Sequence, residues 1–478
     1  MDGVVGGRAR ETRKRVESKT GEVGRRKVGS KGDRFVLPRV WLILVSLFLL
    51  LGRSWAAEAP ASQPLMRDFL GICGHTVQFR PALYAPVCSL VRDYHPVEWD
   101  LGSDTAQLPN FPEAKNRVNW QDVYGSWAKA KFRTDACLMF DGLKPERWKD
   151  MEADSASYAA AFAKRFGPLG KTPLVEAVEI GNEPGNYTDA QYTALLRAVA
   201  PALRKADSRL RIATANLTMG KSTAYAKAVT TLTADGAILP ALDVLTIHTY
   251  ALAEGYPTWR RSFPEDAKLK YLTDVTDLAT WRDGHAAGKA IWITEFGYDA
   301  TTKKPDPKTE FAKWVGVTDA QQAQYLVRST LVFAALPVER AYIYFFDYND
   351  EPHLHGASGI TRHFEPKPAY YALAHLQATL GDYRFSRAVI QRAGELYAYE
   401  FVRGDGSGKR VIAAWSPTGS GRQAVAALAL PVGMKLDHAE RMPLGKEAAV
   451  DVKVVSMEAL PIDESPLYVF LTPSTTAP

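Results

Sequence analysis

Cysteine is scarce in this sequence of 478 residues, which contains only Cys73, Cys88 and Cys137. So low a count rules out a fold built on several disulfides, and the lack of a C-x-x-C spacing argues against a cysteine-based zinc site. Two arrangements stay open: Cys73 and Cys88 form a disulfide, or all three cysteines are small buried apolar side chains.

An apolar run long enough to cross a membrane is also missing. Residues 40–51 are apolar apart from Ser46, but these twelve residues fall short of the roughly 20 that a transmembrane helix needs. Basic residues precede the run and small residues follow it, which is typical of a secretory signal. We therefore predict a signal peptide over 1–57 with a long basic first part. The mature protein would be secreted, periplasmic or extracellular, without stable membrane insertion; an uncleaved anchor is the alternative.

Positive charge is lacking from most of the chain. Residues 1–57 hold thirteen Lys and Arg against five acidic residues, a net +8 within an overall charge of +6. Residues 58–478 therefore carry a net charge of −2. A nucleic-acid partner, which would need a basic surface, is excluded on this count.

No Gly-rich phosphate loop follows the first apolar segment, and no G-x-S-x-G motif occurs. Instead, short apolar segments alternate with longer amphipathic ones, which are residues 155–166, 189–206, 319–335 and 367–380. The candidate strands are residues 69–75, 90–94, 137–140, 177–182, 210–215, 244–248, 290–296 and 342–346. This alternation predicts a parallel sheet covered by helices, and eight units predict an α/β fold of the (β/α)8 TIM barrel type. The alternative is an open doubly wound sheet, which normally carries the missing phosphate loop.

The pattern changes beyond residue 380 to short strands with turns. Residues 396–402 and 410–415 are candidate strands, and the Gly-rich segment 403–409 between them is typical of a hairpin turn. We predict a barrel domain over 65–382 and a small C-terminal β-sandwich-like domain over 383–474.

Two of the candidate barrel strands end in a glutamate. The fourth reads VEIGNEP at residues 178–184 and the seventh reads IWITEFG at residues 291–297. The carboxyl ends of barrel strands form the mouth where enzymes of this architecture hold their catalytic groups. Two carboxyl groups that face each other across a substrate are typical of the catalytic residues of a retaining glycosidase. One of them acts as acid and base, and the other is the nucleophile.

In these two motifs the sequence resembles the retaining glycosidases of glycoside hydrolase clan A, and in detail it is most similar to families 39 and 5. The resemblance covers roughly residues 68–380. It implies that Glu183 is the acid/base, that Asn182 donates to the sugar 2-hydroxyl and that Glu295 is the nucleophile. The alternative interpretations are a glutamate that caps the next helix and a structural carboxylate paired with an arginine.

Four further residues are expected near these carboxyl groups because of their strand positions. His248 and Tyr250 lie on the same side of the sixth strand, where similar clan members use a histidine or an aromatic residue to hydrogen-bond the nucleophile. On the second strand, Arg92 and His95 are candidates to hold the nucleophile or a sugar hydroxyl.

The eighth strand departs from the clan pattern. Many relatives end this strand in a tryptophan beneath the reacting sugar, whereas this sequence reads YFFDY at residues 344–348. Phe346 is expected to offer a ring face there, and Asp347 is expected to bind a sugar hydroxyl.

Metal and cofactor sites are not expected. The loop at residues 350–356 contains acidic residues and histidines, but no other segment supplies the converging ligands of a zinc site, so substrate contact is the better interpretation. We predict no metal and no cofactor.

Taken together, these features predict a secreted retaining glycoside hydrolase that cleaves a β-linked polysaccharide or oligosaccharide, with carbohydrate as its partner. Two alternatives stay open. One is a carbohydrate-binding barrel without turnover, and the other is a transglycosylase that uses the same intermediate.

Overall fold

The computed structural model describes residues 63–447, 449–454 and 456–474. The predicted signal peptide over 1–57 lies outside the described residues. Among the helices that are described, none has the length and apolar character needed to cross a membrane.

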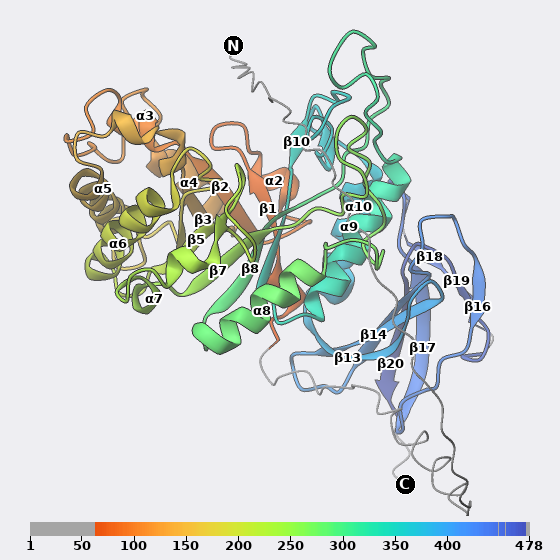
Figure 1. The fold of residues 1–478 in the computed structure, drawn as a ribbon. Coiled ribbons are helices and arrows are strands. Elements are labelled where there is room, and N and C mark those ends of the chain that lie inside the picture. Colours follow the sequence, from red (N-terminus) through yellow and green to blue (C-terminus); the bar gives the residue numbers. More distant parts are fainter. Residues whose placement is uncertain (1–62, 448, 455, 475–478) are drawn as a thin grey trace, which may run out of the picture. The chain divides into compact units, whose positions relative to one another are not determined.

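Eight parallel strands form a closed barrel (Figure 1), as the sequence predicts. Their order is β4-β3-β2-β1-β9-β8-β7-β5, and the pairing of β5 with β4 closes the ring. The barrel strands are β1 (Leu70–Gly74), β2 (Leu90–His95), β3 (Arg133–Leu138), β4 (Ala177–Ile180), β5 (Arg211–Thr218), β7 (Val244–His248), β8 (Ala290–Phe296) and β9 (Arg340–Ile343). Because every strand runs the same way, all eight carboxyl ends open at one mouth.

Two predicted strands are displaced along the chain. The third begins at Arg133 rather than at residue 137, because the buried Asp135 inside the barrel interrupts its apolar pattern. The eighth ends at Ile343, after which the chain leaves the barrel and β10 (Asp347–Tyr348) pairs with β11 (Thr361–Arg362). Residues 344–346 therefore lie beyond the last barrel strand.

Helices connect the barrel strands along the outside (Figure 1). The longer ones are α4 (Trp120–Lys129), α5 (Met151–Phe166), α6 (Asp189–Ala206), α8 (Thr273–His285), α9 (Asp319–Ala334) and α10 (Pro368–Leu380); the short ones are α1 (Met66–Phe69), α2 (Pro81–Tyr84), α3 (Val97–Leu101) and α7 (Ile238–Ala241). Both α6 and α9 begin with a capping box, in which a threonine and a glutamine three residues later satisfy the free backbone N–H groups. These boxes fix where each helix starts after its loop at the mouth.

The C-terminal segment forms an antiparallel sheet with the strand order β13-β14-β15-β20-β17-β18, and a separate pair of strands, β16 and β19. These strands are β13 (Tyr383–Arg392), β14 (Leu396–Arg403), β15 (Arg410–Trp415), β16 (Ala424–Ala426), β17 (Met434–Arg441), β18 (Val450–Asp451), β19 (Leu460–Ile462) and β20 (Leu467–Pro473); the remaining short strands are β6 (Lys227–Ala228) and β12 (Glu365–Pro366). The predicted hairpin joins β14 to β15, and its Gly406 and Gly408 adopt the positive φ angles that such turns require.

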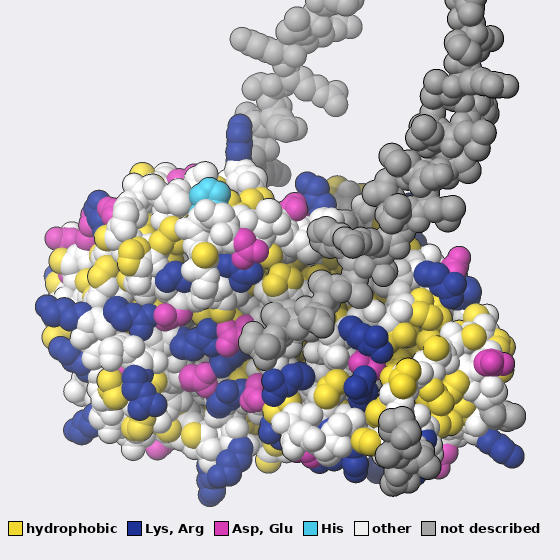
Figure 2. All heavy atoms as spheres, turned by 90° about the horizontal axis from the view of Figure 1, so that it is seen from below, with side chains coloured by type: hydrophobic (Ala, Val, Ile, Leu, Met, Phe, Trp, Pro, Cys, Tyr) yellow, Lys and Arg dark blue, Asp and Glu magenta, His cyan; other side chains and the backbone are white. Residues whose placement is uncertain are grey.

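All three cysteines are free and buried, so the disulfide between Cys73 and Cys88 is not formed. On the face of the molecule shown in Figure 2, basic and acidic side chains are interspersed. This mixture of basic and acidic side chains is consistent with the net charge of −2 that residues 58–478 carry.

One face of the C-terminal sheet shares a hydrophobic core with the barrel. Tyr397, Tyr399 and Trp415 belong to the same buried cluster as the barrel strands. Within this boundary Glu265 accepts two hydrogen bonds from Arg328 of α9 and a third, of 2.6 Å, from Trp415 Nε1. Glu265 and Arg328 are both fully buried at their side chains.

Replacement of Glu265 by alanine is expected to lower the free energy of unfolding by about 3–5 kcal/mol, because it leaves the Arg328 charge buried without a partner. Urea unfolding followed by circular dichroism measures this change. The matched control is Glu395→Ala, which breaks an exposed pair with Arg392 and should alter stability little. Equal losses in the two variants would contradict the importance of the buried pair.

Candidate active site

The two glutamates that the motifs single out meet at the mouth of the barrel. Glu183 follows β4, and Glu295 is the penultimate residue of β8. One oxygen of each carboxyl group and one nitrogen of His248 all lie within 4.8 Å of one another. Glu295 is 6% exposed, whereas 28% of the Glu183 side chain is exposed. The pair therefore consists of one buried carboxyl group and one that solvent can reach.

Glu295 is held by hydrogen-bond donors on both oxygens. Its Oε1 accepts from Arg92 Nη1 at 3.0 Å and from the Tyr94 hydroxyl at 2.6 Å, and its Oε2 accepts from the Tyr250 hydroxyl at 2.8 Å. Burial by itself would raise the pKa of Glu295, but the His248 and Arg92 charges and the two tyrosine hydroxyls outweigh it and lower that pKa to about 2. Glu295 is therefore a carboxylate at neutral pH, fixed in one orientation.

Glu183 is placed by the backbone that leads into it. His248 Nδ1 lies 2.9 Å from its Oε1. The buried carboxylate of Asp141 accepts hydrogen bonds from the backbone N–H groups of Asn182 at 3.0 Å and of Glu183 at 2.7 Å. Just before them, Gly181 has a φ of 94°, a conformation that glycine adopts without strain. This turn aims both N–H groups at Asp141 and lets the Glu183 side chain enter the mouth.

Arg92 links Glu295 to β4 and to the residues that follow it. Besides Glu295 it donates to Asn182 Oδ1 at 2.9 Å, and it binds both oxygens of Glu179 at 2.5 and 3.1 Å. Because the Asn182 carbonyl faces Arg92, the amide nitrogen of Asn182 is the group of that side chain that can donate to a ligand. Sequence reasoning missed Glu179, although it lies only four residues before Glu183 in the same motif.

The structure brings Arg92, His248 and Tyr250 to the two carboxyl groups. It adds Tyr94, which the sequence analysis did not select. Arg92 and Tyr94 are two residues apart on β2 and so point to the same side of the strand. Because side chains alternate between the two faces of a strand, the choice of Arg92 already implies that Tyr94 points to the same side.

His95 is not part of this group, and its expected position is corrected. It is fully buried, with Nε2 2.8 Å from Asp100 Oδ2 and Nδ1 2.7 Å from the Tyr124 hydroxyl, and its ring stacks on Trp120. His95 is three residues from Arg92, so alternation turns it to the outer side of β2, toward the covering helices.

Phe346 and Asp347 also lie elsewhere than expected. The Phe346 ring is 1% exposed and packs edge-on against Phe79 and Tyr84, so no face of it is open to a sugar. Asp347 accepts hydrogen bonds from the Thr361 hydroxyl at 2.7 Å and from the backbone N–H of Phe364 at 2.7 Å. Both residues stabilise the loop structure that follows β9.

Tyr344 and His355 lie near the carboxyl groups, where the sequence analysis expects Phe346 and Asp347. The Tyr344 ring contacts Tyr94 edge-on with centroids 6.4 Å apart, and it contacts His355 at 5.3 Å. His355 also lies 4.9 Å from the Tyr250 ring. The substrate-contacting loop predicted at 350–356 thus brings His355 beside a residue that binds Glu295.

Among the described residues, the only group of His, Cys, Asp and Glu with the spacing of metal ligands is Glu183, His248 and Glu295. The oxygens of Glu295 already accept hydrogen bonds from Arg92, Tyr94 and Tyr250. A carboxylate whose charge is balanced by an adjacent arginine is a poor ligand for a cation, so this donor set fits proton transfer and nucleophilic attack better than metal binding.

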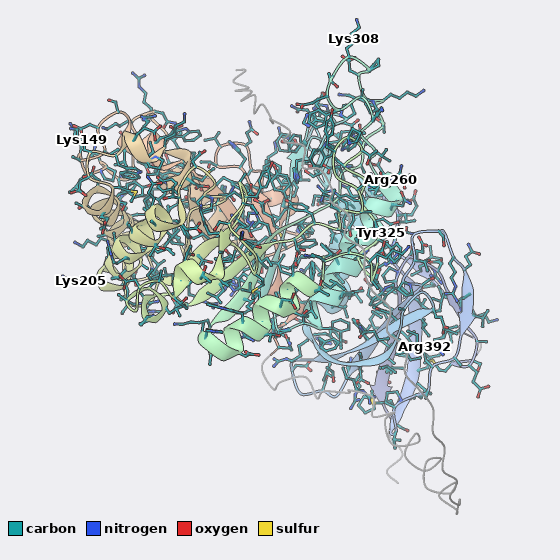
Figure 3. All side chains as sticks on the ribbon, in the orientation of Figure 1. Lys149, Lys205, Arg260, Lys308, Tyr325 and Arg392 are labelled. Atoms are coloured by element: carbon teal, nitrogen blue, oxygen red, sulfur yellow. The ribbon has the colours of Figure 1, made fainter. Side chains whose placement is uncertain are left out.

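A long loop, residues 301–317, runs between β8 and α9 on one side of the molecule. Figure 3 shows Lys308 at the tip of this loop. Arg260, which belongs to the segment between β7 and α8, lies closer to α9. Tyr325, also labelled there, is a residue of α9 and is buried.

No protein-family model matches the sequence, and no curated protein matches it. Solved structures do match. A family 39 glycoside hydrolase from the gut symbiont Bacteroides cellulosilyticus WH2 has a TM-score of 0.62 at 17% identity, over 86% of this chain and 81% of the other. A glucosidase from Croceicoccus marinus has a TM-score of 0.58 at 12% identity, over 88% and 98%. The family 51 α-L-arabinofuranosidase AbfB from Bifidobacterium longum has a TM-score of 0.55 at 15% identity, over 87% and 98%. At such identities the likeness is one of fold, and it confirms the barrel predicted from the alternation of strands and helices.

Proposed function

We propose, from the fold that this chain shares with clan A glycoside hydrolases, that the protein is a secreted retaining glycoside hydrolase of β-linked polysaccharides or oligosaccharides. One observation carries the proposal. The carboxyl oxygens of Glu183 and Glu295 approach within 4.8 Å, close to the roughly 5–5.5 Å typical of retaining enzymes and well below the 6.5–9.5 Å of inverting enzymes.

In the first step, an oxygen of Glu295 attacks the anomeric carbon and the bond from that carbon to the leaving oxygen breaks. Glu183 gives its proton to the leaving oxygen. The low pKa of Glu295 keeps it ionised for this attack, and Arg92, Tyr94 and Tyr250 hold it still. The product of this step is a glycosyl ester on Glu295.

In the second step, Glu183 takes a proton from a water molecule whose oxygen attacks the same carbon. The ester bond breaks and the Glu295 carboxylate is restored. Solvent can reach Glu183, whose side chain is 28% exposed, whereas Glu295 is nearly closed off. This difference suits a residue that exchanges protons with water in every cycle.

Secretion and the substrate class rest on different evidence. The basic, apolar and small-residue segments of 1–57 support export, and export places the enzyme where polysaccharides occur. The Tyr344 ring and the amide nitrogen of Asn182, both beside the carboxyl pair, are groups that bind sugar faces and hydroxyls.

Covalent trapping tests the proposal. The protein is incubated with a panel of 2-deoxy-2-fluoro glycosides bearing a good leaving group, and its peptides are then analysed by mass spectrometry. We expect one fluoroglycosyl group on the peptide that contains Glu295 and none on the Glu295→Gln variant. Hydrolysis whose first product has inverted configuration would overturn the retaining mechanism.

A further inference from the structure

Within residues 63–474, as far as the structure describes them, Arg92 is the only side chain that binds Glu295 and also binds a second carboxyl group that takes no part in the proposed reaction. Its Nε and Nη2 hold Glu179 at 2.5 and 3.1 Å, while Nη1 holds Glu295 at 3.0 Å. Arg92 and Glu179 are both fully buried. The arrangement therefore places one cation between two anions, out of reach of water.

A change of charge on Glu295 disturbs this balance. When Glu295 forms an ester with the sugar it becomes neutral, and Arg92 would then be a buried cation facing a neutral group. A buried charge that loses its partner is costly because neither water nor a counter-ion compensates it. Glu179 accepts from the Nε and Nη2 atoms of Arg92, whereas Glu295 accepts from Nη1, so the ester would not occupy the nitrogen atoms that bind Glu179.

A third carboxyl group bears on which anion serves as the counter-ion. Asp135 of β3 is fully buried in the barrel near Glu179, and neither of its oxygens accepts a hydrogen bond from a donor group among the described residues. Burial and the neighbouring Glu179 raise the pKa of Asp135 well above its usual range, while the same neighbourhood keeps Arg92 charged. Glu179 accepts two hydrogen bonds from Arg92, so it is the carboxyl group that pairs with Arg92 on this side, and the raised pKa of Asp135 favours the neutral form of that residue.

We propose that Glu179 is a positioning residue that neutralises Arg92 throughout the reaction, so that Glu295 can give up its charge to the sugar and later recover it. The inference rests on the proposed retaining function. Without Glu179, Arg92 pairs with Glu295 alone. Attack by Glu295 then becomes slower, because the free carboxylate is held more tightly. Hydrolysis of the ester becomes faster, because it restores the missing anion.

These opposite effects can be measured on the two half-reactions. The wild type and the Glu179→Gln variant are treated with the 2-fluoro glycoside that labels the wild type, and the rates of labelling and of spontaneous loss of the label are determined. We expect labelling of Glu179→Gln to be at least about tenfold slower and loss of the label at least about tenfold faster, as one lost charge contact at this range implies. A residue with only a structural role would slow both rates.

Two further variants serve as controls. Glu265→Gln weakens a fully buried arginine pair at the boundary with the C-terminal sheet and should leave both rates within about threefold of the wild type. Asp135→Asn replaces a carboxyl group that makes no hydrogen bond to Arg92, and it should likewise leave both rates within about threefold of the wild type. If instead Asp135→Asn were labelled more slowly than the wild type and lost the label faster, Asp135 would be the counter-ion of Arg92, and the assignment to Glu179 would be overturned.

The outcomes separate the two proposals. A wild type that acquires no label on Glu295 overturns the retaining function, and the role of Glu179 falls with it. A wild type that is labelled, beside a Glu179→Gln variant in which both rates fall together, overturns the role of Glu179 alone. Should Glu179→Gln fail to fold, the two rates of Asp135→Asn still decide which carboxyl group is the anion.

Discussion

Replacement of Glu295 by glutamine is expected to lower the turnover of an aryl glycoside by a factor of about 10³–10⁵, which corresponds to about 4–7 kcal/mol of lost transition-state stabilisation. The amide keeps the size of the carboxyl group, and its oxygen can still accept from Arg92 or from Tyr94. The fold is therefore expected to survive. What the variant lacks is the negative charge and the nucleophilic oxygen that the proposed mechanism assigns to Glu295.

The measurement is the steady-state release of the aryl group, with KM determined alongside kcat. A loss of kcat at nearly unchanged KM is expected, because a nucleophile acts in the bond-forming step and is expected to contribute little to ground-state binding of the substrate. Glu339→Gln is a matched control. Glu339 binds Arg211 through both oxygens at the amino ends of the barrel strands, opposite the mouth, and its replacement should leave the rate within about twofold. A Glu295→Gln variant that kept a tenth of the wild-type rate would refute the nucleophile assignment.

Replacement of Glu183 by alanine has a different signature, because the two steps depend on it differently. With a dinitrophenyl glycoside, whose leaving group needs no proton, the first step still proceeds and the ester on Glu295 accumulates. Its hydrolysis slows by a factor of about 10²–10⁴, since no base activates the water. Azide needs no base and enters the space left by the missing side chain, so it should restore turnover.

The identity of the product shows whether azide itself attacks the ester in Glu183→Ala or only restores hydrolysis by water. Azide attack on the ester yields a glycosyl azide with the configuration of the substrate, which proton nuclear magnetic resonance identifies. The same reagent added to Glu295→Ala serves as the comparison. If azide rescued Glu295→Ala with retained configuration and had no effect on Glu183→Ala, the two roles would be exchanged.

The sequence predicts the barrel and its two principal carboxyl groups because both follow from periodicity. Alternation of strands and helices specifies a parallel barrel, and parallel strands place all their carboxyl ends at one mouth. Glu183 and Glu295 come directly from this rule. Within a strand, alternation also decides which residues point inward, and applied to β2 it would have favoured Tyr94 over His95.

Other contacts could not be predicted from periodicity. Beyond Ile343 the chain is no longer a barrel strand, so the directions of Tyr344, Phe346 and Asp347 follow from loop packing that no repeating pattern encodes. Asp141 reaches the backbone of Glu183 from a turn after β3, more than forty residues away in the sequence. Such a contact depends on the closed geometry of the whole barrel.

The hydrogen bond from Trp415 to Glu265 has a consequence for how this protein can be divided. A fragment that stopped at the end of α10 would lose Trp415 and the backbone oxygen of Thr418 that also binds Arg328, and would expose the apolar surface that β14 and β15 cover. The C-terminal sheet is therefore an integral part of the barrel's hydrophobic core and not an exchangeable module attached to it. Gene fusions or domain swaps that omit the sheet would remove side chains that complete the hydrophobic core of the barrel, so a transplanted barrel has to carry the sheet along.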